Sequence, residues 1–290
     1  MRATKRDVLA VLPKRRPESH KGDYGRLLIV GGSSRYTGAP ALVGLAALRS
    51  GVDLVTIAAP SAAAKVISSF SPDLITIKLQ CHDLEPAALS GLEGEFGRST
   101  AVVVGSGLGT MASTRDAVIE LARKLRSENP RLSALFDADG LKALAGERAL
   151  CREMPWVFTP HAREFEALTG VNLPPDVKGR LQYVKAAAME LGCTILLKAH
   201  VDVIAGPKGE VKLNYTGNPG MTVGGTGDVL AGIVGTFLSQ GAEPFRAAVA
   251  GAWTCGQAGD LCYRDKGYEF IASDVIEKLP EVFKKVRASR

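Results

Sequence analysis

The sequence has few aromatic residues and no long uninterrupted apolar run. Phenylalanine, tryptophan and tyrosine make up 6% of the 290 residues, which is too few to suggest a nucleic-acid groove lined with aromatic and basic side chains. Glycine, proline or a charge interrupts every apolar stretch short of the roughly 18 to 20 residues that a membrane-spanning helix needs. The apolar piece VLAVL near the N-terminus is too short for a signal-peptide core. We expect a cytoplasmic protein that binds neither nucleic acid nor membrane.

Cysteine is also scarce and forms no recognisable pattern. The five cysteines are widely spaced, odd in number and never paired as CxxC. A disulfide framework or a zinc site would show closer or paired spacing. We therefore expect reduced thiols at Cys81, Cys151, Cys193, Cys255 and Cys262.

The net charge of +6 is concentrated at the two ends of the chain. Residues 1–26 carry eight Lys or Arg against three Asp or Glu, and residues 278–290 carry five against one, so the part between them is net negative. With 46% hydrophobic and 23% charged residues, the composition is that of a globular protein with a sizeable core. We expect one domain over residues 1–290, with a basic N-terminal arm (1–25), a catalytic body (26–277) and a basic C-terminal end (278–290).

Short β-rich runs alternate with helical patterns along most of the chain, which indicates repeated βαβ units. The runs contain little polar alternation, as expected for parallel strands buried on both faces. The predicted fold is therefore α/β, with helices on both sides of a mostly parallel sheet of about nine strands. Clear strands are 26–30, 53–59, 73–79, 101–105 and 133–139, and clear helices are 40–51 and 113–128. Residues 194–215 predict three short strands with a turn at 206–209, a small hairpin at one sheet edge, and the chain after residue 225 is predicted to be helical.

In such sheets the ligand crevice lies beyond the carboxyl ends of the strands, so the loops after the strands deserve inspection. The loop GGSSRYTGAP (31–40) can approach a ligand through its glycines and begins a helix. The loop GSGLG (105–109) lacks the spacing and the position of a dinucleotide fingerprint, which excludes a standard hydride-transfer site. In FTPHAREFEALTG (158–170), His161 and Glu164 lie three apart in the first turn of a helix and point the same way. That pair is either functional or an ordinary helix start.

The most specific loop is GGTGD (224–228), which opens into an apolar helical pattern ending near Gly241. A helix N-terminus offers unpaired N–H groups and the positive end of the helix dipole, and glycines remove side chains that would block access. The loop thus predicts an anion hole. Asp228 beside it could take a proton from a hydroxyl while the N–H groups hold the phosphoryl group transferred to that oxygen; the alternative is that it only complements the dipole.

Several motifs, in this order, resemble the ADP- or ATP-dependent NAD(P)H-hydrate dehydratases of the ribokinase-like superfamily. They are HKGDYGRLLIVGG, YTGAPALVGLAALRSG, GSGLG, DADGL, TPHAREF, LLKAHVDVI and NPGMTVGGTGDVLAGI. The resemblance implies a three-layer ribokinase-like fold and a repair reaction. The ring hydroxyl of hydrated NADH or NADPH, in its S-epimer, would be phosphorylated at the expense of ADP or ATP and then eliminated as phosphate.

The resemblance also implies roles for individual residues. Asp228 would be the base, and Gly225, Thr226 and Gly227 would form the phosphate hole. Ala39, Gly107 and His161 would contact the hydrate together with Asp228. The adenine nucleotide site would comprise Lys198, Ala199, His200, Val201, Asp202 and Gly227. Glu164 would organise Mg²⁺ through water, the ligand that this ion tends to retain.

Two positions depart from the family pattern, and other features stay open. Many relatives have Lys-Gly where this chain has Lys198-Ala199, and often Thr where it has Asp202, which we expect to face a ribose or solvent because it would repel a phosphate. Asp137 and Asp139 in DADGL fit either helix capping or a contact near the nucleotide or metal. The resemblance further implies a homotetramer, for which the small-residue stretch 247–259 offers a packing face, and a separate epimerase.

Two alternatives remain from the sequence. A kinase of the same superfamily, acting on a vitamin-precursor alcohol, would use the same anion hole and base but release a stable phosphate ester. A non-catalytic nucleotide-binding protein would keep the glycines but would not need an acid at position 228.

Overall fold

The computed structural model describes residues 1–288, and within them nine strands form one sheet in the order β3-β2-β1-β4-β5-β6-β7-β8-β9. The parallel strands are β1 (Arg26–Val30), β2 (Leu54–Pro60), β3 (Ile75–Leu79), β4 (Ala101–Val104), β5 (Ser133–Phe136), β6 (Trp156–Phe158) and β7 (Thr194–Leu197). Antiparallel strands β8 (Asp202–Ala205) and β9 (Val211–Asn214) complete the edge. The predicted strand number, the parallel order and the edge hairpin are confirmed.

Consecutive apolar residues in the central strands serve two cores, one on each face of the sheet. In β1, Leu27 and Ile29 join one cluster, whereas Leu28 and Val30 join the other, and all four are at most 1% exposed. Successive side chains of a strand point to opposite faces. An unbroken apolar run is therefore what a strand covered by helices on both faces requires.

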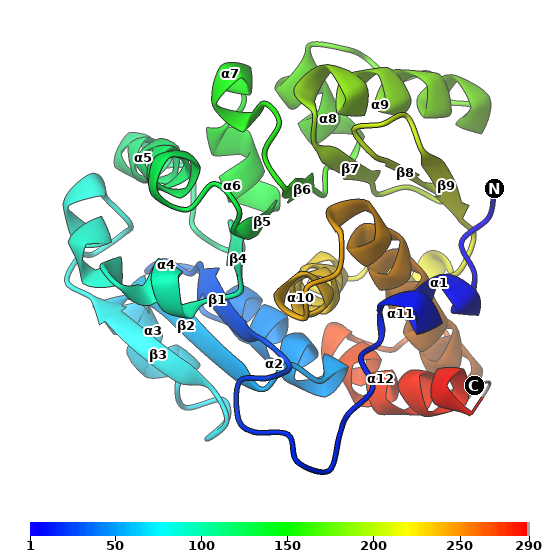
Figure 1. Cartoon of the computed structure of the whole chain (residues 1–290), viewed down its shortest axis with the longest axis horizontal. Coiled ribbons are helices and arrows are strands. Elements are labelled where there is room, and N and C mark those ends of the chain that lie inside the picture. The colour runs from blue at the N-terminus through cyan, green and yellow to red at the C-terminus, as the bar shows by residue number, and fades with distance from the viewer. Residues whose placement is uncertain (289–290) are drawn as a thin grey trace.

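Helices cover both faces of the sheet and produce the three layers seen in Figure 1. One layer contains α1 (Lys5–Val11), α2 (Gly38–Ser50), α3 (Ser61–Ile67), α10 (Thr226–Ser239), α11 (Pro244–Lys266) and α12 (Ala272–Arg287). The other contains the 3-10 helix η1 (Pro86–Leu92) and helices α4 (Glu95–Arg98), α5 (Ala112–Glu128), α6 (Ala138–Ala143), α7 (Arg148–Cys151), α8 (Ala162–Thr169) and α9 (Val177–Leu191). A second 3-10 helix, η2 (Pro219–Thr222), precedes α10.

Helix α10 lies directly on the sheet and against α2, because glycines remove the side chains that would separate them. A Cβ built at Gly232 would lie 2.3 Å from the carbonyl oxygen of Val43 in α2, and one at Gly235 would lie 2.6 Å from Val103 in β4. Only hydrogen fits at these two positions. The close packing fixes where the N-terminus of α10 lies relative to the strand ends.

The basic ends of the chain are part of the folded body, which refines the expected arm and tail. Leu213 in β9 receives a 2.8 Å hydrogen bond from the N–H of Ala3 and donates a 3.0 Å bond to the carbonyl of Met1. Val8 in α1 is fully buried. The basic residues from 278 onward that the structure describes continue α12, where Val286 is 2% exposed.

The cysteines and the helix lengths bear on two expectations from composition. The five cysteines, all within residues 1–288, are free thiols. Every helix in that range is too short or too polar to span a lipid bilayer.

Candidate active site

The order of the sheet reverses between β1 and β4, and the loops that follow these two strands pack on each other. A Cβ built at Gly107 would lie 2.8 Å from Cβ of Tyr36 and 3.3 Å from Cβ of Ala39, and Gly107 has φ of 69°. The lack of space for a Cβ and the positive φ both explain why residue 107 is glycine. The structure thus brings together Ala39 and Gly107, two residues expected to contact the substrate, at the point where open α/β sheets bind ligands.

Three polar side chains follow the ends of the neighbouring strands β5, β6 and β7. Asp137, Thr159 and Lys198 are each the first residue after its strand. Oδ1 of Asp137 accepts a 2.7 Å hydrogen bond from Oγ1 of Thr159 and lies 2.7 Å from Nζ of Lys198. The Asp137 side chain is only 3% exposed. The result is a buried ion pair held by an additional hydroxyl.

The N-terminus of α10 has the unpaired N–H groups that the predicted anion hole needs. Gly225 is the N-cap, and within residues 1–288 the main-chain N–H groups of Thr226, Gly227 and Asp228 donate to no protein acceptor. The hydroxyl of Thr226 instead donates back to the carbonyl of Met221 at 2.8 Å. This bond ties the preceding turn to the helix, so the side chain of Thr226 shapes the loop while its main-chain N–H stays unpaired.

Glycine occupies two positions at the start of this helix for different physical reasons. Gly225 has φ of 96°, and a Cβ there would lie 2.7 Å from Leu42 and 2.9 Å from Ala272. Gly227 has ordinary helical backbone, and a Cβ there would meet only Nζ of Lys198 at 3.7 Å and Oδ2 of Asp137 at 3.9 Å. The fold therefore requires Gly225, whereas the space at Gly227 is available to a ligand.

Asp228 occupies the first turn of α10 and has the electrostatics of a base. Burial, together with the nearby Asp137 carboxylate, raises the pKa of Asp228 to about 7 against the opposing effect of the Lys198 ammonium. A general base functions best when its pKa is near the working pH. The acid that the sequence singled out is therefore partly deprotonated near neutrality.

Lys198 supplies positive charge on the same side of the helix end. Burial alone would lower the pKa of its ammonium, but Asp137, helped by the more distant Glu164 and Asp228, raises that pKa above its ordinary value. Lys198 is consequently charged at neutral pH. Its ammonium lies beside Gly227, where it can face an anion bound at the helix N-terminus.

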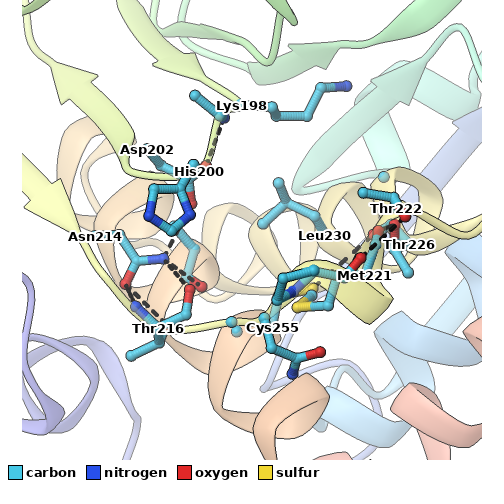
Figure 2. Close-up of a pocket in the computed structure, with 17 residues that line it drawn as sticks. Lys198, His200, Asp202, Asn214, Thr216, Met221, Thr222, Thr226, Leu230 and Cys255 are labelled. Carbon is cyan, nitrogen blue, oxygen red and sulfur yellow. Dashed lines mark hydrogen bonds between the residues drawn. The ribbon is translucent and has the colours of Figure 1, made fainter. Parts of the chain in front are cut away.

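A cavity of about 390 Å³ opens beside this helix end. Figure 2 shows His200, Asp202 and Asn214 along one wall and Met221, Leu230 and Cys255 along the opposite wall. Its lining includes Lys198, Ala199, His200, Asp202, Thr226 and Gly227. Of the residues expected to bind the nucleotide, only Val201 is absent from the lining, and it is 7% exposed.

The Asp202 side chain lines the cavity and is only partly exposed. Its carboxylate accepts 3.0 Å hydrogen bonds from the N–H of Ala199 and from Nδ2 of Asn214. Burial raises the pKa of Asp202 to about 6, although both donors and Lys198 oppose the shift. The carboxylate shapes the wall of the cavity by fixing the turn between β7 and β8.

His161 and Glu164 form a reciprocal cap on α8. The N–H of Glu164 donates to Nδ1 of His161 at 3.2 Å, and the N–H of His161 donates to Oε2 of Glu164 at 3.0 Å. The two side chains do point the same way, with Nε2 of His161 3.4 Å from Oε1 of Glu164. Helix capping accounts for both residues, so a contact of His161 with a substrate stays a prediction.

The two aspartates of DADGL, Asp137 and Asp139, have different structural roles. Asp137 stands at the N-cap of α6 but its side chain makes no capping hydrogen bond. Asp139 accepts a 2.9 Å hydrogen bond from the N–H of Gly109 and lies 3.0 Å from Nζ of Lys142. Asp139 thus anchors the GSGLG loop, whereas the Asp137 carboxylate is directed at Lys198.

The donor groups at the helix end fit magnesium held largely through water. Within residues 1–288, no group of three or more His, Cys, Asp or Glu side chains is arranged to hold a metal ion directly. Mg²⁺ usually keeps several waters and takes one or two carboxylates together with substrate phosphates. The carboxylates near Lys198, on Asp137, Glu164 and Asp228, match that chemistry.

Some cavity residues were not foreseen from the sequence. Asn214, Thr216 and Gly217, together with Ala252, Cys255 and Gly256 in α11, also line the cavity, yet no local motif marks them. The stretch 247–259, expected as a face for a neighbouring subunit, packs inside the chain. Its Gly251 has room for no side chain because of Val234 in α10, 2.3 Å from a Cβ built there.

Comparison with known proteins assigns the family. The family model described as NAD(P)H-hydrate dehydratase matches residues 27–281. The chain belongs to the NAD(P)H-hydrate dehydratase family. A bifunctional NAD(P)H-hydrate repair enzyme Nnr from Pyrobaculum aerophilum is 45% identical over 271 residues, which cover 93% of this chain and 53% of that protein. The chain thus spans about half the length of such bifunctional relatives.

Two further relatives of this family member match over nearly their whole length. An ADP-dependent (S)-NAD(P)H-hydrate dehydratase from Cenarchaeum symbiosum is 39% identical over 285 residues, covering 96% of this chain and 95% of that protein. The crystal structure of ADP/ATP-dependent NAD(P)H-hydrate dehydratase from Bacillus subtilis, co-crystallised with ATP and Mg²⁺, overlaps with a TM-score of 0.79 at 28% identity and 98% coverage of each chain. The ribokinase-like fold class is confirmed.

Proposed function

We propose that this protein catalyses the ADP- or ATP-dependent dehydration of the S-epimer of NAD(P)H hydrate to NAD(P)H. The observation that carries the proposal is the position of Asp228. Its carboxylate, with a pKa raised to about 7 by burial, stands on a helix N-terminus whose N–H groups are unpaired, beside a cavity large enough for a nucleotide. The relatives named for this reaction support the choice of substrates.

The chemistry follows from the leaving group. Hydroxide leaves a carbon poorly, whereas phosphate leaves well. In the proposed first step, Asp228 removes the proton of the ring hydroxyl while that oxygen bonds to the terminal phosphorus of the nucleotide and the bridging P–O bond breaks. In the second step, the ring nitrogen's lone pair expels phosphate, and loss of a proton from the adjacent carbon restores the dihydropyridine. The products are NAD(P)H, phosphate and the shortened nucleotide.

Each part of the site has a task in this scheme. The N–H groups of Thr226 and Gly227 hold the phosphoryl oxygens on which charge develops. Ala39, in the first turn of α2, and Gly107, on the loop after β4, leave room for the hydrated ring to reach Asp228. Mg²⁺, held through water near Glu164, would neutralise part of the negative charge of the phosphates. The cavity lined by residues 198–200 and Asp202 would take the adenine nucleotide.

The decisive experiment measures recovery of reduced nicotinamide. Hydrated NADH is incubated with the protein, Mg²⁺ and either ADP or ATP, and the absorbance of NADH is followed. We expect recovery with nucleotide and none without it. Asp228→Asn keeps the shape but removes the base, so turnover should fall by at least about a hundredfold while nucleotide binding persists. Robust phosphorylation of a vitamin-precursor alcohol, with no NADH recovered, would establish the kinase alternative instead.

The proposal extends to partners. We infer that the protein acts as a cytoplasmic homotetramer together with an epimerase activity, a pairing that the bifunctional relatives support by joining two repair activities in one protein. With a mixture of hydrate epimers, the dehydration should consume the S fraction directly, and added epimerase should allow the remainder to follow. Light scattering of the purified protein measures the subunit number.

A further inference from the structure

We propose that the Lys198 ammonium contacts the phosphoryl group during transfer and that Asp137 is the residue that positions it, with Thr159 fixing the Asp137 carboxylate. This inference rests on the proposed function and deepens it. The three residues follow the adjacent strands β5, β6 and β7 directly. Their arrangement is therefore set by the sheet itself and not by a flexible loop.

Lys198 is within reach of an anion at the helix end. Its Nζ is 3.7 Å from a Cβ built at Gly227, a position that marks the empty space next to the unpaired N–H groups of α10. The side chain is 23% exposed and lines the cavity. A phosphoryl group bound by those N–H groups would have the ammonium on its flank, where a fixed positive charge stabilises developing negative charge.

Asp137 holds the ammonium in that place. Lysine has a flexible four-carbon stem and would otherwise sample several rotamers. The 2.7 Å contact between Oδ1 of Asp137 and Nζ of Lys198 selects one of them. Because the Asp137 side chain makes no capping bond to α6, helix capping does not explain the carboxylate.

Thr159 completes the arrangement from the next strand. It is 1% exposed, and its hydroxyl donates a 2.7 Å hydrogen bond to the same oxygen of Asp137 that receives Lys198. A carboxylate oxygen shared by two donors has little freedom to turn. Thr159 therefore acts on Lys198 only through Asp137.

A double-mutant cycle tests this chain of dependence. Lys198→Met removes the charge and keeps the stem, and should lower kcat by about 10²- to 10³-fold. Asp137→Asn should lower kcat by about 10- to 100-fold, and Thr159→Val by about fivefold, with KM for the hydrate unchanged in all three. In a Lys198→Met background, Asp137→Asn should change kcat by less than about twofold, because nothing remains to be positioned.

A matched control removes a similar ion pair elsewhere. Lys212 and Asp7 lie 2.9 Å apart, with side chains 20% and 23% exposed, at the β9 edge. Asp7→Asn should leave kcat and both KM values unchanged. Thermal melting of every variant identifies any that fails to fold; if Asp137→Asn does, Thr159→Val with and without Lys198→Met provides the same comparison.

The outcomes separate this proposal from the proposed function. Full additivity of Asp137→Asn and Lys198→Met would overturn the positioning role, as would an Asp137→Asn variant restored by raised Mg²⁺, since the carboxylate would then serve the ion. An unaltered Lys198→Met enzyme would overturn the catalytic contact. If wild-type protein restores no NADH from its hydrate, the proposed function fails, yet the affinity of the same variants for a non-hydrolysable ATP analogue still tests the three-residue arrangement.

Discussion

The main-chain N–H of Gly32 donates a 2.9 Å hydrogen bond to the carbonyl of Ser106, and this bond joins the loops that follow β1 and β4. The same carbonyl oxygen lies 2.7 Å from where a Cβ of Gly31 would stand. The glycine-rich loops after β1 and β4 are thus locked together at the point where the sheet order reverses. This contact also sets the distance between Ala39 and Gly107, because Ala39 lies in the first turn of the helix that follows the first loop and Gly107 belongs to the second.

Gly31→Ala should therefore separate the loops and weaken binding of the hydrate. A Cβ closer than 3.0 Å to a backbone oxygen forces one loop to move, and neither can move without displacing Ala39 or Gly107. We expect KM for the hydrate to rise by about tenfold or more, with the dissociation constant for ATP within about twofold of wild type. Gly97→Ala is the control, because a Cβ at Gly97 meets nothing within 4 Å. Unchanged hydrate KM in Gly31→Ala would show that the loops do not form the hydrate site.

Activity should depend on the protonation of Asp228. With its pKa raised to about 7 by burial, the base is lost as the pH falls, so kcat should decline by about tenfold per pH unit below that value. Rates measured from pH 5 to 9 check this statement. A flat profile down to pH 5 would remove Asp228 from the role of base.

Loss of the fold cannot account for such an acidic limb through this group. The folded-state pKa of Asp228 is raised above the unfolded value near 3.8. Its protonated form is therefore favoured by folding, and its contribution to stability is fully present at low pH and lost as the pH rises through about 7. Between pH 7 and pH 5 the Asp228 contribution stabilises the protein while the base disappears.

The fold could be predicted from the sequence because the patterns that indicate its strands and helices are local and repeated. Strand 26–30 was predicted to the residue, and the hairpin at 194–215 was placed at the sheet edge where β8 and β9 lie. The glycine-rich helix start at 224–228 can also be recognised from five consecutive residues, because it needs only an N-cap residue with positive φ and an N2 residue without a side chain. Such patterns require no knowledge of distant contacts.

The Asp137–Thr159–Lys198 arrangement could not be predicted in the same way. These residues are separated by 22 and 39 positions, and only the parallel alignment of β5, β6 and β7 brings them within hydrogen-bonding distance. Asp137 fitted helix capping equally well until its side chain was seen to make no cap. The signal that would have found them is their shared position as the first residue after a buried strand.

Asn214 should stabilise the wall of the cavity in a pH-dependent way. It is 1% exposed and donates to Asp202 at 3.0 Å. Asn214→Leu leaves that carboxylate with fewer donors, so we expect a loss of about 1 to 3 kcal/mol in the free energy of unfolding at pH 8. Because the pKa of Asp202 is raised to about 6, its share of stability is present below pH 4 and lost as the pH rises through 6, and the loss caused by Asn214→Leu should be smaller at pH 5.

Urea unfolding at the two pH values measures this difference. Thr216→Val is the matched control, because it removes the 2.8 Å bond from Oγ1 of Thr216 to Oδ1 of Asn214 without touching Asp202. Its effect on stability should be the same at pH 5 and pH 8. Equal losses for Asn214→Leu at both pH values would show that Asn214 does not act on the Asp202 carboxylate.

The two glycines at the start of α10 should separate stability from activity. Gly225→Ala places a Cβ at φ of 96° and 2.7 Å from Leu42, so the free energy of unfolding should fall by about 1 to 3 kcal/mol. Gly227→Ala meets no close protein atom and adds a better helix former, so its melting temperature should be unchanged or higher. Its methyl group would nevertheless occupy the space beside Lys198, and kcat should fall by about 10²-fold or more. Melting curves and turnover on both variants decide the matter: a Gly227→Ala enzyme with full activity would mean that no phosphoryl group approaches this helix end.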